Sequence, residues 1–455
     1  MLTLGATSPS ILSMNIDLPN SDFSGVYAAH VREWSSRFTA ALEAAEFDSV
    51  LIFSGPELTA FRDDSIYPFS AEPYFKTWLP LSRHPGSAIR FVPGEKPRLI
   101  YFQDDSFWHA PPAVPEGQWL EHFELRHAGS EAEVAAALEP LSGRVATIGP
   151  PQAAGIDRGT ANDTTLLARL DYTRARKTAY EVACIEAANA IAAVGHRTIA
   201  EAFSTSASEF ELDQIYCQAT RQRASTLPYP NIIALNEHAA TLHYQHLGHA
   251  RCGTPGSLLI DAGATFNGYA ADITRTYCHG SESMQALIAA MDELQQSLCA
   301  EVRSGIDFVS LNDTAHKLLA TVLHDRNLLR CSAAEGYERG ITRTFLPHGL
   351  GHLLGVQVHD AGGHFAGPDG SRRAPPPEHP MLRLTRVLEP GFVVTIEPGL
   401  YFIPSLLDAL RNHANGNAIN WPEIEQLAGL GGIRIEDDVL VTASGAHNLT
   451  RAALG

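Results

Sequence analysis

The sequence predicts an α+β protein in two domains: an α/β domain over residues 1–172 and a larger α+β domain over 173–455. The length of 455 residues allows two large domains or three smaller ones. The hydrophobic content of 45% supports a substantial core, and the charged content of 18% argues against a mainly disordered chain. The third observation is the order of the elements. Helices and short strands alternate first, and capped helix pairs followed by groups of strands come later.

The N-terminal domain is expected to open with a long helix. Its apolar residues recur at steps of three and four, as on one helix face: Tyr27, Val31, Trp34, Phe38, Leu42 and Ala45. An apolar run over 50–53 then predicts a buried strand, which Gly55-Pro56 ends. The remaining elements expected in this domain are strands over 88–92, 98–102 and 145–148 and a helix over 130–138.

The domain boundary is expected at 172/173, because the basic segment 174–177 shows no apolar period. Capping boxes of the Ser/Thr-x-x-Glu type then predict helix starts at Thr178 and Ser208, and the first helix runs to about Phe203. The later elements expected are helices over 283–303 and 311–324 and strands over 232–234, 257–260, 273–278, 393–397 and 432–442. Helix pairs thus precede strand groups twice, which suggests an internal duplication.

Composition excludes several classes of function. The net charge of −18 argues against nucleic-acid binding, which needs a basic surface. No apolar stretch approaches the 18 residues of a membrane span, and residues 1–20 lack the basic and apolar regions of a signal peptide. Residues 1–13 are expected to be a disordered leader, with Met14 as an alternative start. The six cysteines form no CxxC pair, which favours reduced thiols and a cytoplasmic location.

Two acids flank a predicted hairpin in the second half. Asn267-Gly268 is a strong two-residue turn signal, and this turn would place Asp261 opposite Thr274. Asp272 then lies two residues from Thr274 on the same face. The two carboxylates become a diagonal pair, ~7–8 Å apart at the backbone. Such a pair calls for a cation between the acids; the alternative is two solvated acids beside a turn.

Further metal-ligand residue types follow. His348, His352 and His359 stand within twelve residues among Gly and apolar neighbours, although each alone could be a structural histidine. Glu397 ends an apolar strand, and Glu436 lies beside Arg434, with which it could instead form an ion pair. Four carboxylates and one histidine would neutralise two divalent cations, with a hydroxide bridging them. Oxygen-rich ligation favours Mn²⁺, and two metals sharing one water form a hydrolytic device.

These motifs resemble the pita-bread metallopeptidases. Four acids and one histidine match that family's ligand pattern in order, context and approximate spacing: Asp261, Asp272, His352, Glu397 and Glu436. Within the family the chain is most similar to bacterial Xaa-Pro dipeptidases (prolidases) and the related organophosphorus acid anhydrolases. The segments that carry this similarity are Asp63-Asp64-Ser-Ile-Tyr-Pro-Phe, Phe75-Lys-Thr-Trp-Leu-Pro80, His379-Pro-Met-Leu-Arg-Leu-Thr-Arg386 and Thr395-Ile-Glu-Pro-Gly-Leu-Tyr-Phe402.

The resemblance implies a pita-bread catalytic domain with a creatinase-like α/β N-terminal domain, and hydrolysis of Xaa-Pro dipeptides by a metal-bridged hydroxide. Asp272 and Glu436 would bridge both ions, Asp261 would complete one site, and His352 with Glu397 would complete the other. Glu397 would also carry the proton of the bridging water. The family's catalytic histidines correspond to His243 and His359, the latter stabilising the tetrahedral intermediate.

The resemblance also implies a set of substrate contacts. His348 would line the proline pocket, and Tyr229 and Leu242 would line the substrate pocket. Arg383 would bind the substrate carboxylate, with Arg386 as the alternative, and Arg434 would support Glu436 and the proline pocket. The substrate ammonium would meet Asp64, from the same subunit or from the partner in a homodimer.

Three alternatives accompany this interpretation. An aminopeptidase P would use the same ligands on longer peptides with proline second. A non-catalytic pita-bread binding module would have lost its metal, which the complete ligand set argues against. Weak side activity on organophosphates is conceivable because the same dinuclear centre can attack phosphorus.

Overall fold

The structure is a computed structural model that describes residues 23–104, 106, 108, 114–203, 207–251 and 256–455. The expected leader over 1–13, Met14 and Cys252 lie outside these residues. The other five cysteines are free thiols, as predicted. In the described part of the chain, none of the helices combines the length and apolar character that a membrane crossing requires.

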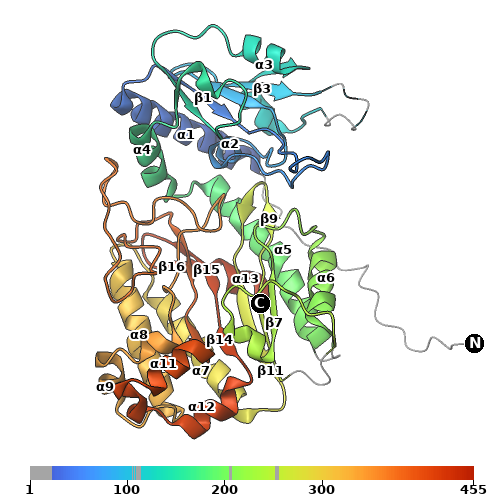
Figure 1. The fold of residues 1–455 in the computed structure, drawn as a ribbon. Helices are drawn as coiled ribbons and strands as arrows, with labels where there is room; N and C mark the ends of the chain where they lie inside the picture. Colours follow the sequence, from blue (N-terminus) through green and yellow to red (C-terminus); the bar gives the residue numbers. More distant parts are fainter. Residues whose placement is uncertain (1–22, 105, 107, 109–113, 204–206, 252–255) are drawn as a thin grey trace, which may run out of the picture.

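The N-terminal part is a six-stranded sheet covered by helices (Figure 1). Its strands lie in the order β4 (Glu124–Ala128), β3 (Arg98–Phe102), β2 (Ala88–Phe91), β1 (Ser49–Phe53), β5 (Val145–Ile148) and β6 (Thr160–Ala161). The helices are α1 (Phe23–Ala45), α2 (Pro73–Trp78), α3 (Glu131–Ala137) and α4 (Thr164–Arg174). The predicted apolar face of α1 is buried, and the Phe38 ring packs at an angle against Trp78 and edge-on against Phe91 in the core.

The remainder repeats one order of elements, a helix pair followed by a three-stranded sheet (Figure 1). Helices α5 (Ala179–Phe203) and α6 (Glu209–Thr220) precede the sheet of β7 (Ile232–Leu235), β8 (Ser257–Asp261) and β11 (Thr274–Cys278). Helices α7 (Glu282–Glu301) and α8 (Phe308–Asp325) precede the sheet of β12 (Val393–Ile396), β15 (Asp437–Val441) and β16 (Ala446–Asn448). Both predicted capping boxes are present, at Thr178 and at Ser208.

Shorter elements complete the fold. They are the hairpin β9 (Thr265–Phe266) and β10 (Tyr269–Ala270), the pair β13 (Gly399–Tyr401) and β14 (Gly432–Arg434), and helices α9 (Ala333–Glu338), α10 (Thr342–Phe345), α11 (Pro404–Arg411), α12 (Trp421–Ala428) and α13 (Leu449–Leu454).

The single strand predicted over 432–442 is wrong. The chain forms β14 and then β15, with Glu436 between them. The two pieces have different partners, because β14 pairs with β13 whereas β15 pairs with β12. A continuous strand cannot follow both partners. At the break Glu436 makes a single bridge to Thr274, which directs it to the strand that follows Asp272.

The basic segment 174–177 contributes two buried cations to the interior of the protein. Helix α4 continues to Arg174, and the side chains of Arg174 and Lys177 are buried. Both form ion pairs with the buried Asp360, which explains how two cations fit inside the protein. The segment therefore joins the N-terminal sheet to the loop that follows His359.

Candidate metal centre

A tight hairpin sets the register of the first two acids. Asn267 and Gly268 have φ values of 49° and 87°, as a two-residue turn of this kind requires. Asp261 consequently pairs with Thr274, as predicted from the sequence. Asp272 follows β10, where Tyr229 donates a 2.6 Å hydrogen bond to its Oδ1. The hairpin thus brings both carboxylates to one end of β8.

Three side chains converge on one point. Ligand atoms of Asp272, His352 and Glu436 lie within 4.8 Å of one another, and all three residues are buried. His352 Nδ1 contacts the Leu353 carbonyl at 3.0 Å, which leaves Nε2 to face Asp272 Oδ2 at 3.5 Å and Glu397 Oε1 at 3.7 Å. The ring is therefore oriented as a metal-binding imidazole needs to be.

The electrostatics of the cluster are those of an uncompensated anionic site. Burial raises the pKa of Glu397 to about 7, and nearby carboxylates add to the rise. Burial and the charges of Asp272, Glu397 and Asp261 raise the pKa of Glu436 well above its usual range. Burial would lower the pKa of His352, but its contacts with Asp272 and Glu397 raise it to about 9. Burial and the repulsion between the carboxylates thus both favour the binding of positive charge at these residues.

The residues fit a pair of divalent cations. Asp261 Oδ1 is buried and has no hydrogen-bond partner among the described residues, so it can accept a cation without breaking a contact. Four carboxylates and one imidazole form an oxygen-rich donor set suited to hard divalent ions. Cation binding would displace the proton on His352 and remove the repulsion that raises the glutamate pKa values.

Arg434 does not have the partner expected from the sequence. Its Nη2 donates a 2.6 Å hydrogen bond to Asp261 Oδ2, and its ion pair is with this acid rather than with Glu436. The break after β14 turns Glu436 away from Arg434. Glu436 Oε2 instead accepts a 2.6 Å hydrogen bond from the Thr274 hydroxyl. Arg434 also donates to the Tyr401 hydroxyl at 3.0 Å. All of these groups are buried, so Arg434 holds one acid of the cluster in place.

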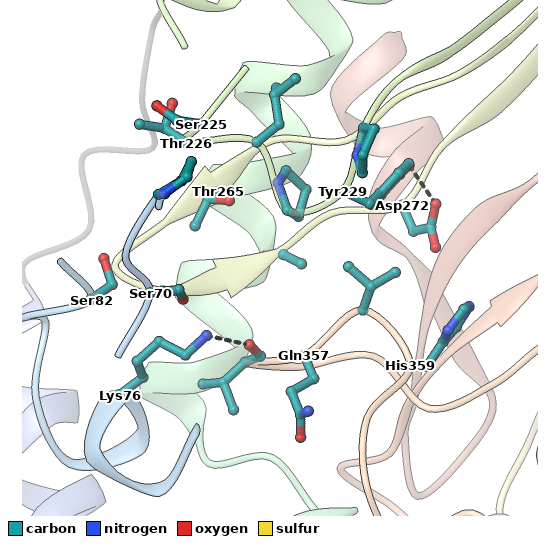
Figure 2. Close-up of a pocket in the computed structure, with 18 of the residues that line it drawn as sticks. Ser70, Lys76, Ser82, Ser225, Thr226, Tyr229, Thr265, Asp272, Gln357 and His359 are labelled. Atoms are coloured by element: carbon teal, nitrogen blue, oxygen red, sulfur yellow. Dashed lines mark hydrogen bonds between the residues drawn. The ribbon is translucent and has the colours of Figure 1, made fainter. Parts of the chain in front are cut away.

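Two cavities meet at the proposed ligand residues, called here the acidic cluster: Asp261, Asp272, His352, Glu397 and Glu436. The small cavity, of about 150 Å³, contains Leu242, His348, Arg383 and Arg434. The large cavity, of about 610 Å³, contains Tyr229 and extends to the N-terminal sheet domain (Figure 2). The residues that line both cavities are His243, Asp261, Asp272 and His359. A substrate cleaved at the cluster would therefore have one portion in each cavity.

The structure distinguishes the two arginine candidates. Arg383 lines the small cavity, and its guanidinium makes no hydrogen bond or ion pair within the described residues. Arg386 is buried, donates to the Tyr172 carbonyl and pairs with Glu389. Only Arg383 is thus available to a ligand. Burial, as the largest cause, lowers the pKa values of His348 and His359 to about 4, so both imidazoles are neutral near pH 7.

Asp64 is separate from the other predicted site residues. It lies on an exposed hairpin, the 58–67 hairpin, which is closed by the bridge between Thr59 and Ile66. It lines neither the small cavity nor the large one. The structure therefore brings together every predicted ligand and pocket residue except Asp64.

Comparison with known families assigns the chain. The model of metallopeptidase family M24 matches residues 183–443, and the model described as Xaa-Pro dipeptidase, N-terminal domain, matches residues 25–172. The chain belongs to metallopeptidase family M24. This confirms the predicted pita-bread domain and its N-terminal companion, and it confirms the prediction of a hydrolytic enzyme that uses divalent metal.

Proteins similar to this one align with almost its whole length. The Xaa-Pro dipeptidase of Stenotrophomonas maltophilia strain K279a is 44% identical, over 95% of this chain and 98% of its own. That of Xanthomonas axonopodis pv. citri is 42% identical, over 95% and 99%. Among solved structures, aminopeptidase P from E. coli with the inhibitor Pro-Leu has a TM-score of 0.70 at 24% identity, covering 93% of this chain and 95% of that one. At that identity the likeness shows the fold.

The loop that contains His243 is held in place by Glu209, a residue that the sequence did not single out. Glu209, at the start of α6, is buried, and its carboxylate is the common partner of groups spread along residues 235–248: the Leu235 and Gly248 N–H groups, the His238 imidazole and the Tyr244 hydroxyl. Burial would raise its pKa, but these hydrogen bonds lower it. Leu242 and His243 lie within this loop. The sequence signal was the Ser208 capping box, which assigned a role only to Glu211.

Asp360, which the sequence likewise did not single out, supports the loop that contains His359. Asp360 accepts from Arg174 Nε at 3.0 Å and from Lys177 Nζ at 2.9 Å, and Arg174 also contacts Gln357. Burial would raise the pKa of Asp360, but the two cations lower it to about 2. The available signal was the His359-Asp360 pair, which does not reveal partners more than 180 residues away.

Proposed function

We propose that this M24 enzyme hydrolyses Xaa-Pro dipeptides to a free amino acid and proline. The observation that carries the proposal is the placement of the acidic cluster between a small cavity with an unpaired arginine and a large cavity. The constant half of the substrate, proline with its carboxylate, suits the small cavity and Arg383. The variable residue suits the large one. The name of the similar Stenotrophomonas and Xanthomonas proteins, Xaa-Pro dipeptidase, supports this substrate class.

Two divalent ions, which we propose to be Mn²⁺, would be held by Asp261, Asp272, His352, Glu397 and Glu436. When bound, the ions would polarise the scissile carbonyl and acidify a water molecule.

The protein's own groups would then position the substrate and move the proton. The Glu397 carboxylate accepts the proton of the attacking water and delivers it to the proline nitrogen as the peptide bond breaks. His359, and His243 across the same junction of cavities, donate hydrogen bonds toward the oxygen that gains negative charge. His348, held at 2.8 Å from the Tyr401 hydroxyl, forms one wall of the proline site.

Hydrolysis of Ala-Pro and Ala-Pro-Ala by metal-free protein, before and after Mn²⁺ is added, tests the proposal. We expect Mn²⁺-dependent cleavage of Ala-Pro, and at least about tenfold slower cleavage of the tripeptide, because its proline carboxylate is blocked and Arg383 loses a charge-assisted contact. Proline release measured by chromatography gives both rates. Faster cleavage of the tripeptide would assign an aminopeptidase P activity, and no cleavage of either would reject the peptidase proposal.

We further propose a cytoplasmic homodimer in which the 58–67 hairpin packs against a second copy. Four large apolar side chains of this hairpin are exposed, Phe61 by 90%, and the others are Leu58, Ile66 and Tyr67. Asp64 at the tip lines no cavity of its own subunit, so a second copy is the partner that would bring it to a substrate ammonium.

The proposed boundary between the two domains of each subunit remains 172/173.

Substitution Phe61→Asp tests the dimer. We expect the wild-type protein to elute with the mass of a dimer and the variant with that of a monomer, because a charge replaces a buried apolar contact at the interface. Light scattering after gel filtration gives the mass. Val114→Asp, at another exposed apolar residue, is the matched control and should remain dimeric. A monomeric wild type, or a dimeric Phe61→Asp variant, would contradict the proposed contact.

A further inference from the structure

We propose that the large cavity selects dipeptides whose first residue carries a carboxylate side chain, so that Glu-Pro and Asp-Pro are preferred over their amide counterparts. This inference rests on the proposed function, because it assigns the variable residue to the large cavity. It adds a substrate class that the dipeptidase assignment alone does not specify.

The geometry defines two ends of this cavity. Asp272, Tyr229 and His359 lie at the end next to the candidate metal centre (Figure 2). Lys76 and Ser82, from the N-terminal domain, lie at the opposite end (Figure 2). A dipeptide with its scissile bond at the cluster would direct its first side chain away from the metal and toward Lys76. The volume of about 610 Å³ leaves room for a long side chain.

The charges of the two ends differ. Asp261 and Asp272 are the only acids in the described lining, and both belong to the metal centre, where bound cations would neutralise them. The distant end has two cations, Lys76 and Arg83, and no acid lines the cavity there. Hydroxyl groups that can donate further hydrogen bonds also line the cavity: Ser70, Ser82, Ser225, Thr226 and Thr265.

Neither cation forms an ion pair with a carboxylate among the described residues. Lys76 Nζ donates one 2.9 Å hydrogen bond, to the Val356 carbonyl, and an ammonium has three donors (Figure 2). Arg83 Nη1 donates to the Phe69 carbonyl at 3.3 Å, and the other N–H groups of its guanidinium make no hydrogen bond within the described residues. Burial lowers the pKa of Lys76 to about 8 and the charge of Arg174 adds to this effect, whereas the charges of Glu72 and Asp360 oppose it.

A ligand carboxylate would supply the missing negative charge. Hydrogen bonds to charged groups contribute more than neutral ones, so a Glu or Asp side chain should bind this end better than its amide, by on the order of 10- to 100-fold in kcat/KM. A Lys or Arg side chain should be disfavoured there by like-charge repulsion.

The test compares isosteric substrates on the Mn²⁺-loaded enzyme at pH 7. The readout is the ratio of kcat/KM for Glu-Pro over Gln-Pro, measured within each variant, so that a general loss of activity cancels. We expect a ratio of at least about 10 for the wild type. The ratio should fall toward 1 in Lys76→Met and should fall below the wild-type value in Arg83→Glu. Arg326→Glu, which makes the same charge change at an exposed arginine without side-chain partners in the described structure, should keep the wild-type ratio.

A wild-type ratio near or below 1 would overturn the inference, as would an unchanged ratio in both cavity variants. Arg83 is exposed, so its variant should fold even if Lys76→Met disturbs the loop at Val356. Failure of the proposed function looks different, because then Ala-Pro is not cleaved at all. In that case calorimetric Kd values of Glu-Pro and Gln-Pro for the metal-loaded protein still decide the preference of the cavity.

Discussion

Asp272→Asn is expected to lower kcat/KM for Ala-Pro by on the order of 10³-fold or more. The substitution removes one negative charge from a donor set whose ligand atoms lie within 4.8 Å of those of His352 and Glu436. An amide binds hard cations less well than a carboxylate, and each 1.36 kcal/mol of lost transition-state stabilisation costs about tenfold in rate. The measurements are steady-state proline release and metal content per subunit by elemental analysis.

The control for this prediction is Asp325→Asn. Asp325 is an exposed acid at the end of α8 that lines neither cavity of the site, and its variant should keep wild-type activity and metal content. Asp272→Asn should contain less metal than the control. If it keeps full activity with two ions bound, Asp272 is not a ligand and the proposed centre is wrong.

The sequence predicted the ligand end of the site well because local chemistry determines it. Asn267-Gly268 allows a turn with two positive φ values, and that turn alone fixes which residue faces Asp261. The capping box at Thr178 likewise fixed the start of α5. In both cases the determining residues lie within a few positions of one another.

The parts that could not be predicted depend on contacts between distant segments. The apolar pattern along 432–442 is the same whether the segment pairs with one strand or with two. The sequence therefore could not show the break at Glu436, where the partner strand changes. Arg434 therefore seemed to face Glu436, whereas its partner is Asp261, 173 residues away. Glu209 looked like an ordinary residue in the first turn of a helix, and only the fold brings the 235–248 loop onto its carboxylate.

The basic segment at the domain junction illustrates the same limit. The residues 174–177 alone give no sign that two of their cations are buried, because the acid that neutralises both lies far downstream. The consequence is functional as well as structural. The paired residues join α4 to the loop of His359, so the N-terminal domain helps to fix one wall of the site.

Asp360→Ala is accordingly expected to destabilise the protein by ~3–5 kcal/mol, because it leaves Arg174 and Lys177 buried without a counter-charge. The side chains of Asp360 and Lys177 are 0% exposed, and that of Arg174 is 2% exposed, so solvent cannot compensate for the loss. Urea unfolding of the metal-loaded protein, followed by far-UV circular dichroism, gives the shift in midpoint. Activity should fall in parallel, because the loop of His359 loses its anchor.

The pH dependence of stability separates the effect of this ion pair from the effect of lost packing. Asp360→Asn is the matched variant, because it removes the charge and keeps the shape of the side chain. The pKa of Asp360 is lowered to about 2 in the folded protein, below its ordinary value near 4 when unfolded. Its charge therefore stabilises the fold fully above pH 4, and that stabilisation is lost as pH falls toward 2. The difference in stability between wild type and Asp360→Asn should be constant from pH 5 to 7 and should narrow below pH 4. A difference that does not change with pH in this range would mean that Asp360 acts by shape and hydrogen bonding rather than by charge.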